Sequence, residues 1–159
     1  MKELPISVAI SVLIKDNKIL LIRRIRGNLI GFWGLPGGKI EKNEHLSEAA
    51  TREIFEESGI ESEFKEHIGF VSEHLIENGK VYEHVLLNVC KLDPKTIQIS
   101  NNNEGKLAWF DLDKIYSIKD KIIPSDFLMI EKMVKNREKN YYNCIMEKLG
   151  GKYILKKFD

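Results

Sequence analysis

Three glutamates lie close together in one short stretch of the sequence, REIFEESGI at residues 52–60. At 3.6 residues per helical turn, Glu53, Glu56 and Glu57 project from one face of a helix within about one turn. Like charges at this spacing destabilise a helix by roughly 0.2–0.5 kcal/mol per pair. Arg52 can pair with Glu56 four positions on, but one arginine does not neutralise the group. The pattern predicts that something else offsets the repulsion.

A divalent cation that prefers oxygen ligands would offset this repulsion. Mg²⁺ in particular is held by one or two carboxylates together with water and substrate phosphates. A solvated, glutamate-rich helix face is the alternative, because glutamate is a strong helix former and needs no ligand in water. The three residues taken alone leave both interpretations open.

The wider spacing around the glutamates favours the metal site. Gly38 is followed after five residues by Glu44, and after seven more by the run REIFEESGI. This arrangement resembles the Nudix box, G-x5-E-x7-R-E-U-x-E-E-x-G-U with U aliphatic, at every defining position. Seven fixed residue types at fixed spacing match by chance at roughly 10⁻⁸ per starting point. The chain therefore looks like a Nudix hydrolase.

The resemblance implies both a fold and a reaction class. The implied fold is α/β (α+β), with a mixed β-sheet sandwiched between α-helices and the box as a loop-helix-loop catalytic motif. Family members typically hydrolyse a nucleoside diphosphate linked to another group, as water attacks phosphorus with the help of Mg²⁺ or Mn²⁺. At 159 residues, the chain is expected to form a single such domain over residues 1–159.

The roles of the box residues follow from the same resemblance. Glu56 and Glu57 would be the leading metal ligands, and Glu53 a further ligand or the group that orients the attacking water. Arg52 would hold a glutamate in place, and Glu44 would hold the arginine.

Two further positions complete the expected catalytic site. Gly38 would let its backbone approach the metal or a phosphate, although a simple turn glycine is the alternative. Glu104 is the candidate for a fourth carboxylate, as a ligand or general base, because NNNEGKLAWF resembles a loop of MutT-like nucleoside triphosphatases. A solvated loop glutamate is the alternative for Glu104. His45 departs from the Ser or Thr of many members at the helix start, which touches no metal position.

The box does not name the substrate. Resemblance through LLIRR, WFDLDKI and IIPSDF favours MutT-like and oxidised-purine nucleoside triphosphatases. We therefore expect an intact or oxidised nucleoside triphosphate to be cleaved to a monophosphate and pyrophosphate. ADP-ribose or another nucleoside diphosphate derivative is the alternative substrate. A nucleotide-binding regulator without catalysis is the alternative outside enzymes.

Candidate substrate contacts lie outside the box. Arg23 or Arg24 would meet phosphates, and Trp33 or Tyr82 would stack on a base. Asp126 would read a purine edge by hydrogen bonds, because the segment around it resembles one at the base pocket of such enzymes. The alternative is that Asp126 is an ordinary acidic residue at the start of a helix and contacts no ligand.

Periodicity and turn signals predict the elements that must position these residues. A β-hairpin is expected over residues 6–24, followed by a glycine-rich loop over 27–38 and a helix from Glu44 to Ser58 that Gly59 ends. Asn78-Gly79 predicts a second hairpin within residues 62–92, and Gly150-Gly151 a third near the C-terminus.

The segment between these hairpins is expected to hold a strand and a helix. The run LAWFDLDKI predicts a short strand that leads into a turn. Pro124 is placed to begin a helix. Its predicted buried stripe consists of Phe127, Ile130, Met133 and Val134.

Charge and composition exclude several classes of protein. Lysine and arginine number 25 against 24 acidic residues, so a path for double-stranded nucleic acid is not implied and RNA decapping is disfavoured. The apolar run at residues 6–14 is too short for a bilayer, so a cytoplasmic location without membrane contact is expected. Cys90 and Cys144 are expected to be reduced, buried thiols. A homodimer would be in keeping with the family.

Overall fold

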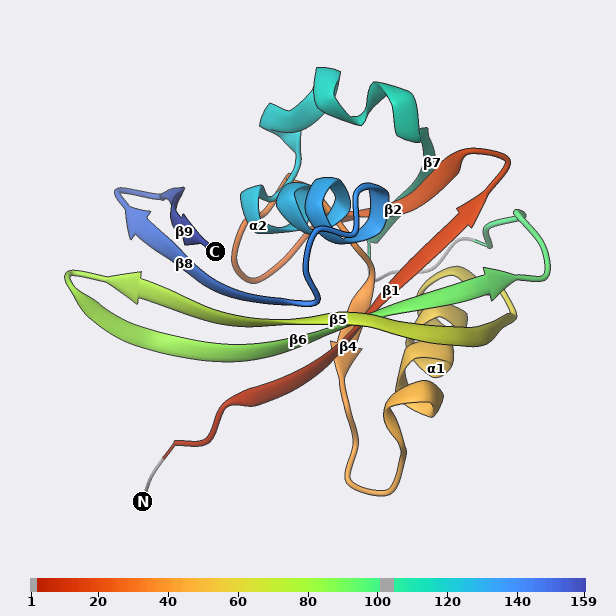
Figure 1. The fold of residues 1–159 in the computed structure, drawn as a ribbon, viewed down its shortest axis with the longest axis horizontal. Coiled ribbons are helices and arrows are strands. Elements are labelled where there is room, and N and C mark those ends of the chain that lie inside the picture. Colours follow the sequence, from red (N-terminus) through yellow and green to blue (C-terminus); the bar gives the residue numbers. More distant parts are fainter. Residues whose placement is uncertain (1–2, 101–104) are drawn as a thin grey trace.

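The computed structural model describes residues 3–100 and 105–159, which form a curled mixed β-sheet with helices on both faces (Figure 1). The strands are β1 (Ile6–Lys15), β2 (Lys18–Arg24), β3 (Trp33–Gly34), β4 (Gly37–Lys39), β5 (Ser62–Glu77), β6 (Lys80–Pro94), β7 (Gly105–Asp111), β8 (Tyr141–Leu149) and β9 (Lys152–Phe158). Their order in the sheet is β3-β2-β1-β6-β5-β8-β9, with β4 paired to β1 and β7 paired to β2. The pairs β1–β6 and β5–β8 are parallel, so the sheet is mixed.

The central strand β1 explains why the sequence begins with an almost unbroken apolar run. Ala9 and Leu13 face a core on one side of the sheet, while Ile10 and Val12 face a core on the other. A strand covered on both faces has no solvent side that would require polar residues. Ser11 is also fully buried, and its hydroxyl donates to the carbonyl of Ala50 at 3.1 Å.

The three predicted hairpins are present. Each turns through two residues with positive φ, as the tight turns that match the twist of antiparallel strands require. These residues are Asp16 and Asn17 (φ 50° and 61°), Asn78 and Gly79 (53° and 74°), and Gly150 and Gly151 (54° and 83°).

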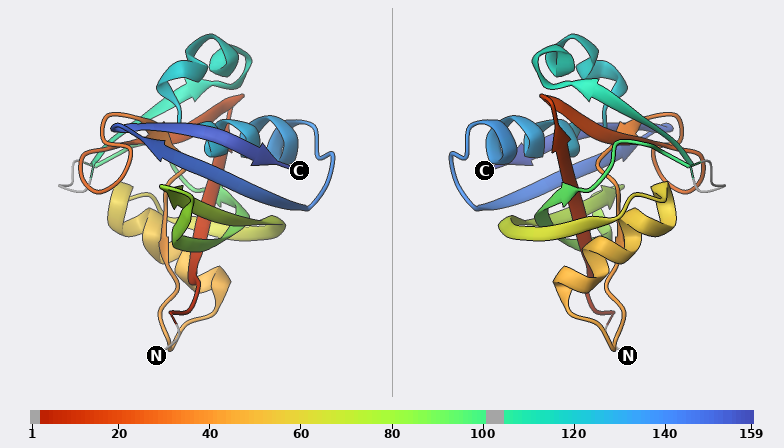
Figure 2. Two further views of the ribbon diagram at one scale, coloured as in Figure 1. Left: turned by 90° about the vertical axis from the view of Figure 1, so that its left-hand side faces the viewer. Right: turned by 90° about the vertical axis from the view of Figure 1, so that its right-hand side faces the viewer.

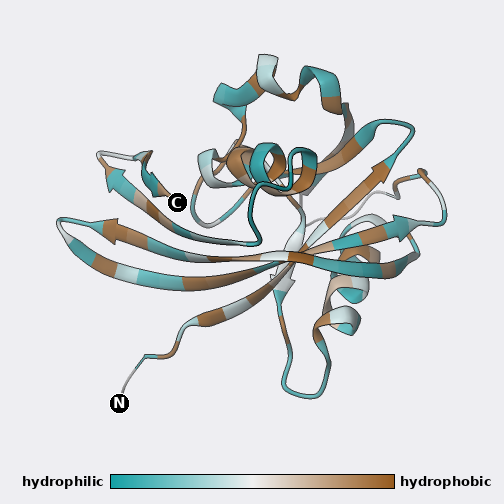
Figure 3. Cartoon of the chain, viewed as in Figure 1, coloured by the Kyte–Doolittle hydropathy of each residue, from teal (hydrophilic) through white to brown (hydrophobic). Residues whose placement is uncertain are grey.

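Helices cover the two faces of the sheet (Figure 2). The helix α1 (Leu46–Ser58) packs Ala49, Ala50 and Ile54 into one core. The opposite core contains Ile115, Met129, Ile130 and Met133 from η1 (Leu112–Lys121) and from η2 (Met129–Lys135), which directly continues α2 (Pro124–Leu128). Figure 3 shows brown and teal bands alternating along β5 and β6, while the loop from β4 to α1 is largely teal.

The boundaries differ from the sequence prediction at two places before residue 60. The helix α1 begins at Leu46 instead of Glu44, because His45 is the extended N-cap and Glu44 belongs to a turn in which its carboxylate accepts from the Glu41 N–H at 2.9 Å. The glycine-rich segment was expected to be a loop only. It contains β3 and β4, which pair with β2 and β1 because the sheet edge there is open to short strands.

The C-terminal third also differs in detail. The strand β7 leads into the 3₁₀ helix η1, whose start is capped by the Asp111 carboxylate accepting from the Asp113 N–H at 2.9 Å, where a turn was expected. The predicted helix is present, with Ile130 and Met133 fully buried, Phe127 and Val134 partly buried, and Met129 as a further buried residue.

Cys90 and Cys144 are buried and not disulfide-bonded, as predicted. Burial raises the pKa of the Cys90 thiol to about 12, which keeps it protonated. Within the described ranges, the structure contains no helix with the length and apolar character needed to cross a membrane.

Candidate functional site

The last turns of α1 carry the acidic cluster and present its members to different environments. Glu57 is nearly buried at 5% exposure, because it lies on the side of the helix that packs on the sheet. The side chain of Glu53 is 15% exposed and that of Glu56 is 51% exposed. The helix ends at Gly59, whose φ of 76° is a left-handed conformation that glycine adopts without strain. Glu57 and Glu53 are therefore the more enclosed carboxylates.

Arg52 lies at the centre of the acidic cluster. Its Nε and Nη2 donate to the two oxygens of Glu44 at 2.8 and 2.6 Å, in a two-point pair. Its Nη1 donates to Glu53 at 2.8 Å and to Glu56 at 3.2 Å. The hydrogen bond from Arg52 lowers the pKa of the Glu44 carboxyl to about 2. Arg52 therefore holds Glu44 and neutralises part of the cluster by itself.

Gly38 lies directly against the Glu53 carboxylate. A Cβ atom at this position would be 2.2 Å from the Glu53 Cδ atom and 2.3 Å from its Oε1. No side chain fits there while Glu53 keeps its place. The Glu53 carboxylate thus lies where a side chain at position 38 would be, which explains why this position of β4 is a glycine.

The donor chemistry of the cluster fits a hard divalent cation. Glu53 and Glu57 both line a cavity of about 280 Å³ and offer carboxylate oxygens, the ligands that Mg²⁺ and Mn²⁺ take. Across residues 3–100 and 105–159, however, no three acidic, histidine or cysteine side chains are close enough to form a ready-made ligand set. Arg52 occupies the space between Glu53 and Glu56 through its Nη1 atom.

The same cavity brings positive charge to the glutamates. Arg24 and Arg26 line it together with Glu53 and Glu57. Carboxylates that can hold a cation beside arginines that can pair with phosphate oxygens make a suitable environment for a pyrophosphate group. Arg24 was predicted from the sequence, whereas Arg26 was not.

A second cavity, of about 400 Å³, adjoins the first and is the larger cavity of this pair. The two share Ile22, Arg24, Leu35 and Gly37 in their walls. Asp126 lines the second cavity and is buried, with its Oδ2 accepting from the Leu35 N–H at 2.8 Å. The predicted residues Arg24 and Asp126 are therefore brought to one continuous region with Glu53 and Glu57.

Other predicted substrate contacts lie elsewhere. Arg23 lies over the ring of Trp33, 6.0 Å from its centroid, and Trp33 packs edge-on against Phe110 at 4.8 Å. Neither residue lines the two adjoining cavities. Tyr82 lines a separate hollow beside the N-terminal segment. Glu104 lies outside the described residues.

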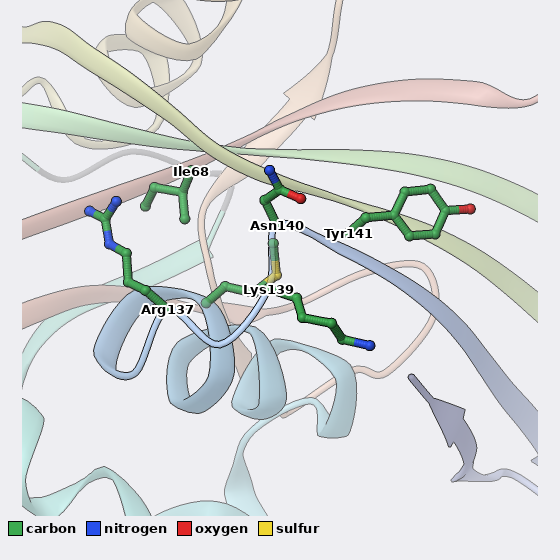
Figure 4. Close-up of a pocket in the computed structure, with 6 residues that line it drawn as sticks. Ile68, Arg137, Lys139, Asn140 and Tyr141 are labelled. Carbon is green, nitrogen blue, oxygen red and sulfur yellow. The ribbon is translucent and has the colours of Figure 1, made fainter.

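A further hollow, of about 480 Å³, contains none of the predicted site residues. It lies between η2 and the start of β8 and is drawn in Figure 4. Its polar walls are basic, but Arg137 is already paired with Glu66. The acidic cluster and this hollow are separate features, so the chemistry suggested by the glutamates belongs to the adjoining cavities.

Sequence reasoning missed Glu73, a buried carboxyl in the wall of the larger cavity. A signal was available, because Glu73 stands between Val71 and Leu75 at the inward positions of β5. In a strand of alternating burial, a glutamate at an inward position is a departure that requires an explanation.

Comparison with known proteins gives a family match and a common fold. The NUDIX domain model matches residues 5–132. A solved structure, the MutT protein from Bacillus halodurans, superposes with a TM-score of 0.72 at 23% identity and covers 95% of this chain and 97% of its own. The predicted fold, a mixed sheet between helices, is confirmed.

Two of the similar proteins are named for an enzymatic activity. The chain is 36% identical over 102 residues to an ADP-ribose pyrophosphatase from Methanocaldococcus jannaschii, covering 64% of this chain and 59% of the relative. It is 28% identical over 102 residues to an oxidized purine nucleoside triphosphate hydrolase from Danio rerio, covering 64% of each. For three further curated relatives, the matched region spans only 33–51% of their length.

Proposed function

Because this chain belongs to the NUDIX family, we propose that it is a pyrophosphohydrolase that cleaves a nucleoside diphosphate-linked substrate. The observation that carries the proposal is one cavity lined by Glu53, Glu57, Arg24 and Arg26, next to a larger cavity that shares Arg24 and has many aliphatic lining residues. A polyphosphate fits the first cavity by charge, and the uncharged end of a nucleotide fits the second by size.

Our preferred substrate is a nucleoside triphosphate, intact or oxidised, which would yield a nucleoside monophosphate and pyrophosphate. Arg24 and Arg26 would pair with the phosphate oxygens and orient the chain of phosphates along the cavity. Glu53 and Glu57 would hold Mg²⁺, or Mn²⁺ in its place, with Glu56 approaching from the exposed side of α1. When bound, such an ion lowers the pKa of water and neutralises phosphate charge.

Arg52 and Glu44 would act on the reaction indirectly. The two-point pair between them fixes the guanidinium, and the guanidinium fixes the Glu53 carboxylate through the 2.8 Å hydrogen bond. Arg52 is thus a positioning residue, because its contacts are with the carboxylates and with the Lys39 carbonyl at 3.1 Å.

ADP-ribose is the second candidate substrate, favoured by the identity to the archaeal ADP-ribose pyrophosphatase. It shares a pyrophosphate with a nucleoside triphosphate, so the first cavity would serve both. The products differ, because ADP-ribose yields AMP and ribose phosphate and releases no pyrophosphate.

Phosphate-product analysis of a nucleotide panel tests the proposal. Canonical and oxidised nucleoside triphosphates, ADP-ribose, NADH and dinucleoside polyphosphates would be incubated with Mg²⁺ and either the unmutated protein, Glu57→Gln or Glu61→Gln. We expect pyrophosphate from a triphosphate, a loss of roughly a hundredfold or more in Glu57→Gln, and no change in Glu61→Gln, whose side chain is exposed just beyond α1. An absence of metal-dependent turnover across the panel would favour the non-catalytic nucleotide-binding regulator.

A further inference from the structure

The larger cavity has an apolar body and an acidic wall, in which Glu73, Glu83 and Asp126 lie beside Arg24 and Lys39. Its volume of about 400 Å³ falls in the range of roughly 300–1,000 Å³ that small-molecule sites occupy. Strands β1, β5 and β6 contribute aliphatic side chains, among them Val8, Ile10, Leu75, Val85 and Leu87. Such walls suit the faces of a flat, uncharged ring system.

Two buried carboxyls, Glu73 and Asp126, interrupt this apolar lining. Each is 8% exposed. The Cys144 thiol donates to Glu73 Oε2 at 3.7 Å, and the Leu35 N–H donates to Asp126 Oδ2 at 2.8 Å. The Ser125 side chain is hydrogen-bonded to both carboxyls, with 3.5 Å between its Oγ and Asp126 Oδ1. Among the ion pairs of the described residues, none involves either carboxyl. A carboxylate has about four acceptor sites, so Glu73 can accept further hydrogen bonds besides those from the Ser125 hydroxyl and the weak thiol donor.

The fold does not require a carboxyl at position 73, although Glu73 accepts from Ser125 and Cys144. An inward position of β5 between Val71 and Leu75 would be satisfied by an aliphatic residue. Burial raises the pKa of Glu73, and a buried ionisable group without a cation lowers the stability of the folded state. A ligand that donates hydrogen bonds to Glu73 would reverse this cost.

The charge of the cavities sets the orientation of a nucleotide. The phosphates belong beside Arg24 and Arg26, where Glu53 and Glu57 would be screened from them by the divalent cation that these two carboxylates are proposed to hold. Glu73 and Asp126 have no such proposed cation and would repel phosphate, so the base belongs beside Glu73. A carboxylate offers two oxygens that only accept, so it matches two adjacent N–H donors in a bidentate pair. Guanine carries such a pair on one edge, N1–H beside the 2-amino group. Adenine presents an amino group beside an acceptor nitrogen on that edge.

We propose that Glu73 is a specificity-determining residue that accepts hydrogen bonds from two adjacent N–H groups of a guanine-type base seated in the larger cavity. This inference rests on the proposed function, and it names the base class that the site selects. Asp126, whose Oδ2 is occupied by the Leu35 N–H, completes the acidic wall.

Nucleoside monophosphates test the inference, because their binding requires no hydrolysis. Calorimetry in magnesium buffer would measure GMP, IMP and AMP against the unmutated protein, Glu73→Gln and Glu77→Gln. IMP lacks only the 2-amino group, so the ratio of GMP to IMP affinity isolates that donor. Glu77→Gln is the matched control, because Glu77 is an exposed glutamate on the same strand that pairs with Lys148 at 3.8 Å.

We expect the unmutated protein and Glu77→Gln to bind GMP about tenfold or more tightly than IMP, as for a hydrogen bond to a charged group. In Glu73→Gln the ratio should fall towards one, while AMP binding does not weaken, because an amide offers the donor and acceptor that an adenine edge matches. An unchanged ratio in Glu73→Gln would overturn the inference, as would the absence of GMP preference or of any monophosphate binding to the unmutated protein.

Folding of the variant is checked independently. Gln has the shape of Glu and can still accept from the Cys144 thiol, and thermal unfolding would show whether the fold is kept. Glu73→Asp is a second variant that keeps the charge but withdraws it by one methylene, so the ratio should fall there too. If the ratio of GMP to IMP affinity depends on Glu73 but no nucleotide is hydrolysed, the proposed function is refuted and the inferred base recognition is kept.

Discussion

The protein contains two groups of acidic side chains whose charges are balanced in different ways. On α1, Glu53 and Glu56 share the guanidinium of Arg52, a residue of the same helix. In the larger cavity, Glu73 and Asp126 come from β5 and α2, and neither takes part in an ion pair among the described residues. The first group is stabilised by a local cation, whereas the second depends on protons or a ligand. The presence or absence of a neighbouring cation therefore separates the carboxylates of α1, which are held in place by Arg52, from the carboxyls of the larger cavity, which can bind a ligand.

The largest expected effect lies in the second group and concerns pH. Burial, with Glu73 nearby, raises the pKa of Asp126 to about 7, although the Leu35 N–H and Arg24 act in the opposite direction. The unfolded chain has an aspartate pKa near 3.9. Between these values the folded state binds more protons, so stability should fall as pH rises from about 4 to about 7, by on the order of a few kcal/mol, and level off above.

Chemical denaturation from pH 4 to pH 8 measures this dependence in the unmutated protein and in Asp126→Asn. Asn is neutral throughout and can still accept from the Leu35 N–H, so the variant should lose most of the decline and exceed the unmutated protein in stability at pH 8. Glu73 contributes a remaining slope of the same sign, because its pKa is also raised. Parallel profiles for the two proteins would mean that Asp126 is ionised in the fold, and the contrast between the two acidic groups would fail.

The contrast also explains which parts of the site the sequence predicts. Glu53, Glu56 and Glu57 lie within one helical turn, so 3.6-residue periodicity places them together without knowledge of the fold. The three hairpins are equally local, since two-residue turns such as Asn78-Gly79 require special backbone conformations. These features depend on neighbours in the chain.

The parts that sequence did not predict depend on tertiary structure. Whether Glu73 meets Asp126 is decided by how β5 and α2 pack, 53 positions apart. Side-chain alternation decides that Arg24 faces the cavities while Arg23 lies over Trp33. The strands β3 and β4 form because β1 and β2 offer open edges, a property of the assembled sheet that a glycine-rich segment does not reveal.

A smaller effect is expected in the first group, from Arg52→Lys. Lysine keeps the charge but has no planar fork, so the two-point pair with Glu44 and the contacts to Glu53 and Glu56 cannot all be maintained. We expect activity on the best substrate to fall about 10- to 100-fold, as for residues that orient metal ligands. The Mg²⁺ concentration for half-maximal activity should rise.

Metal titration of the reaction distinguishes this role from a structural one. Loss of stability alone would lower activity at every Mg²⁺ concentration by the same factor. Lys135→Arg is a control, because Lys135 pairs with Glu131 at 3.1 Å on η2, away from the acidic cluster. Unchanged metal dependence in Arg52→Lys would show that the local cation of α1 only stabilises the helix.

The smallest effect on activity, about tenfold, is expected for Gly38→Ala, because the three atoms nearest to its new methyl group all belong to the Glu53 carboxylate. Gly37→Ala is the matched comparison, since its Cβ would meet the Ala9 backbone oxygen at 2.4 Å, in the middle of β1. A side chain can rotate away, whereas a paired strand cannot. Gly38→Ala should therefore lose activity at nearly unchanged thermal stability, and Gly37→Ala should lose roughly 1–3 kcal/mol of stability. If instead Gly38→Ala unfolds as readily as Gly37→Ala, the Glu53 side chain cannot rotate away from the new methyl group. The contacts of Arg52 with Glu53 would then be a rigid part of the fold.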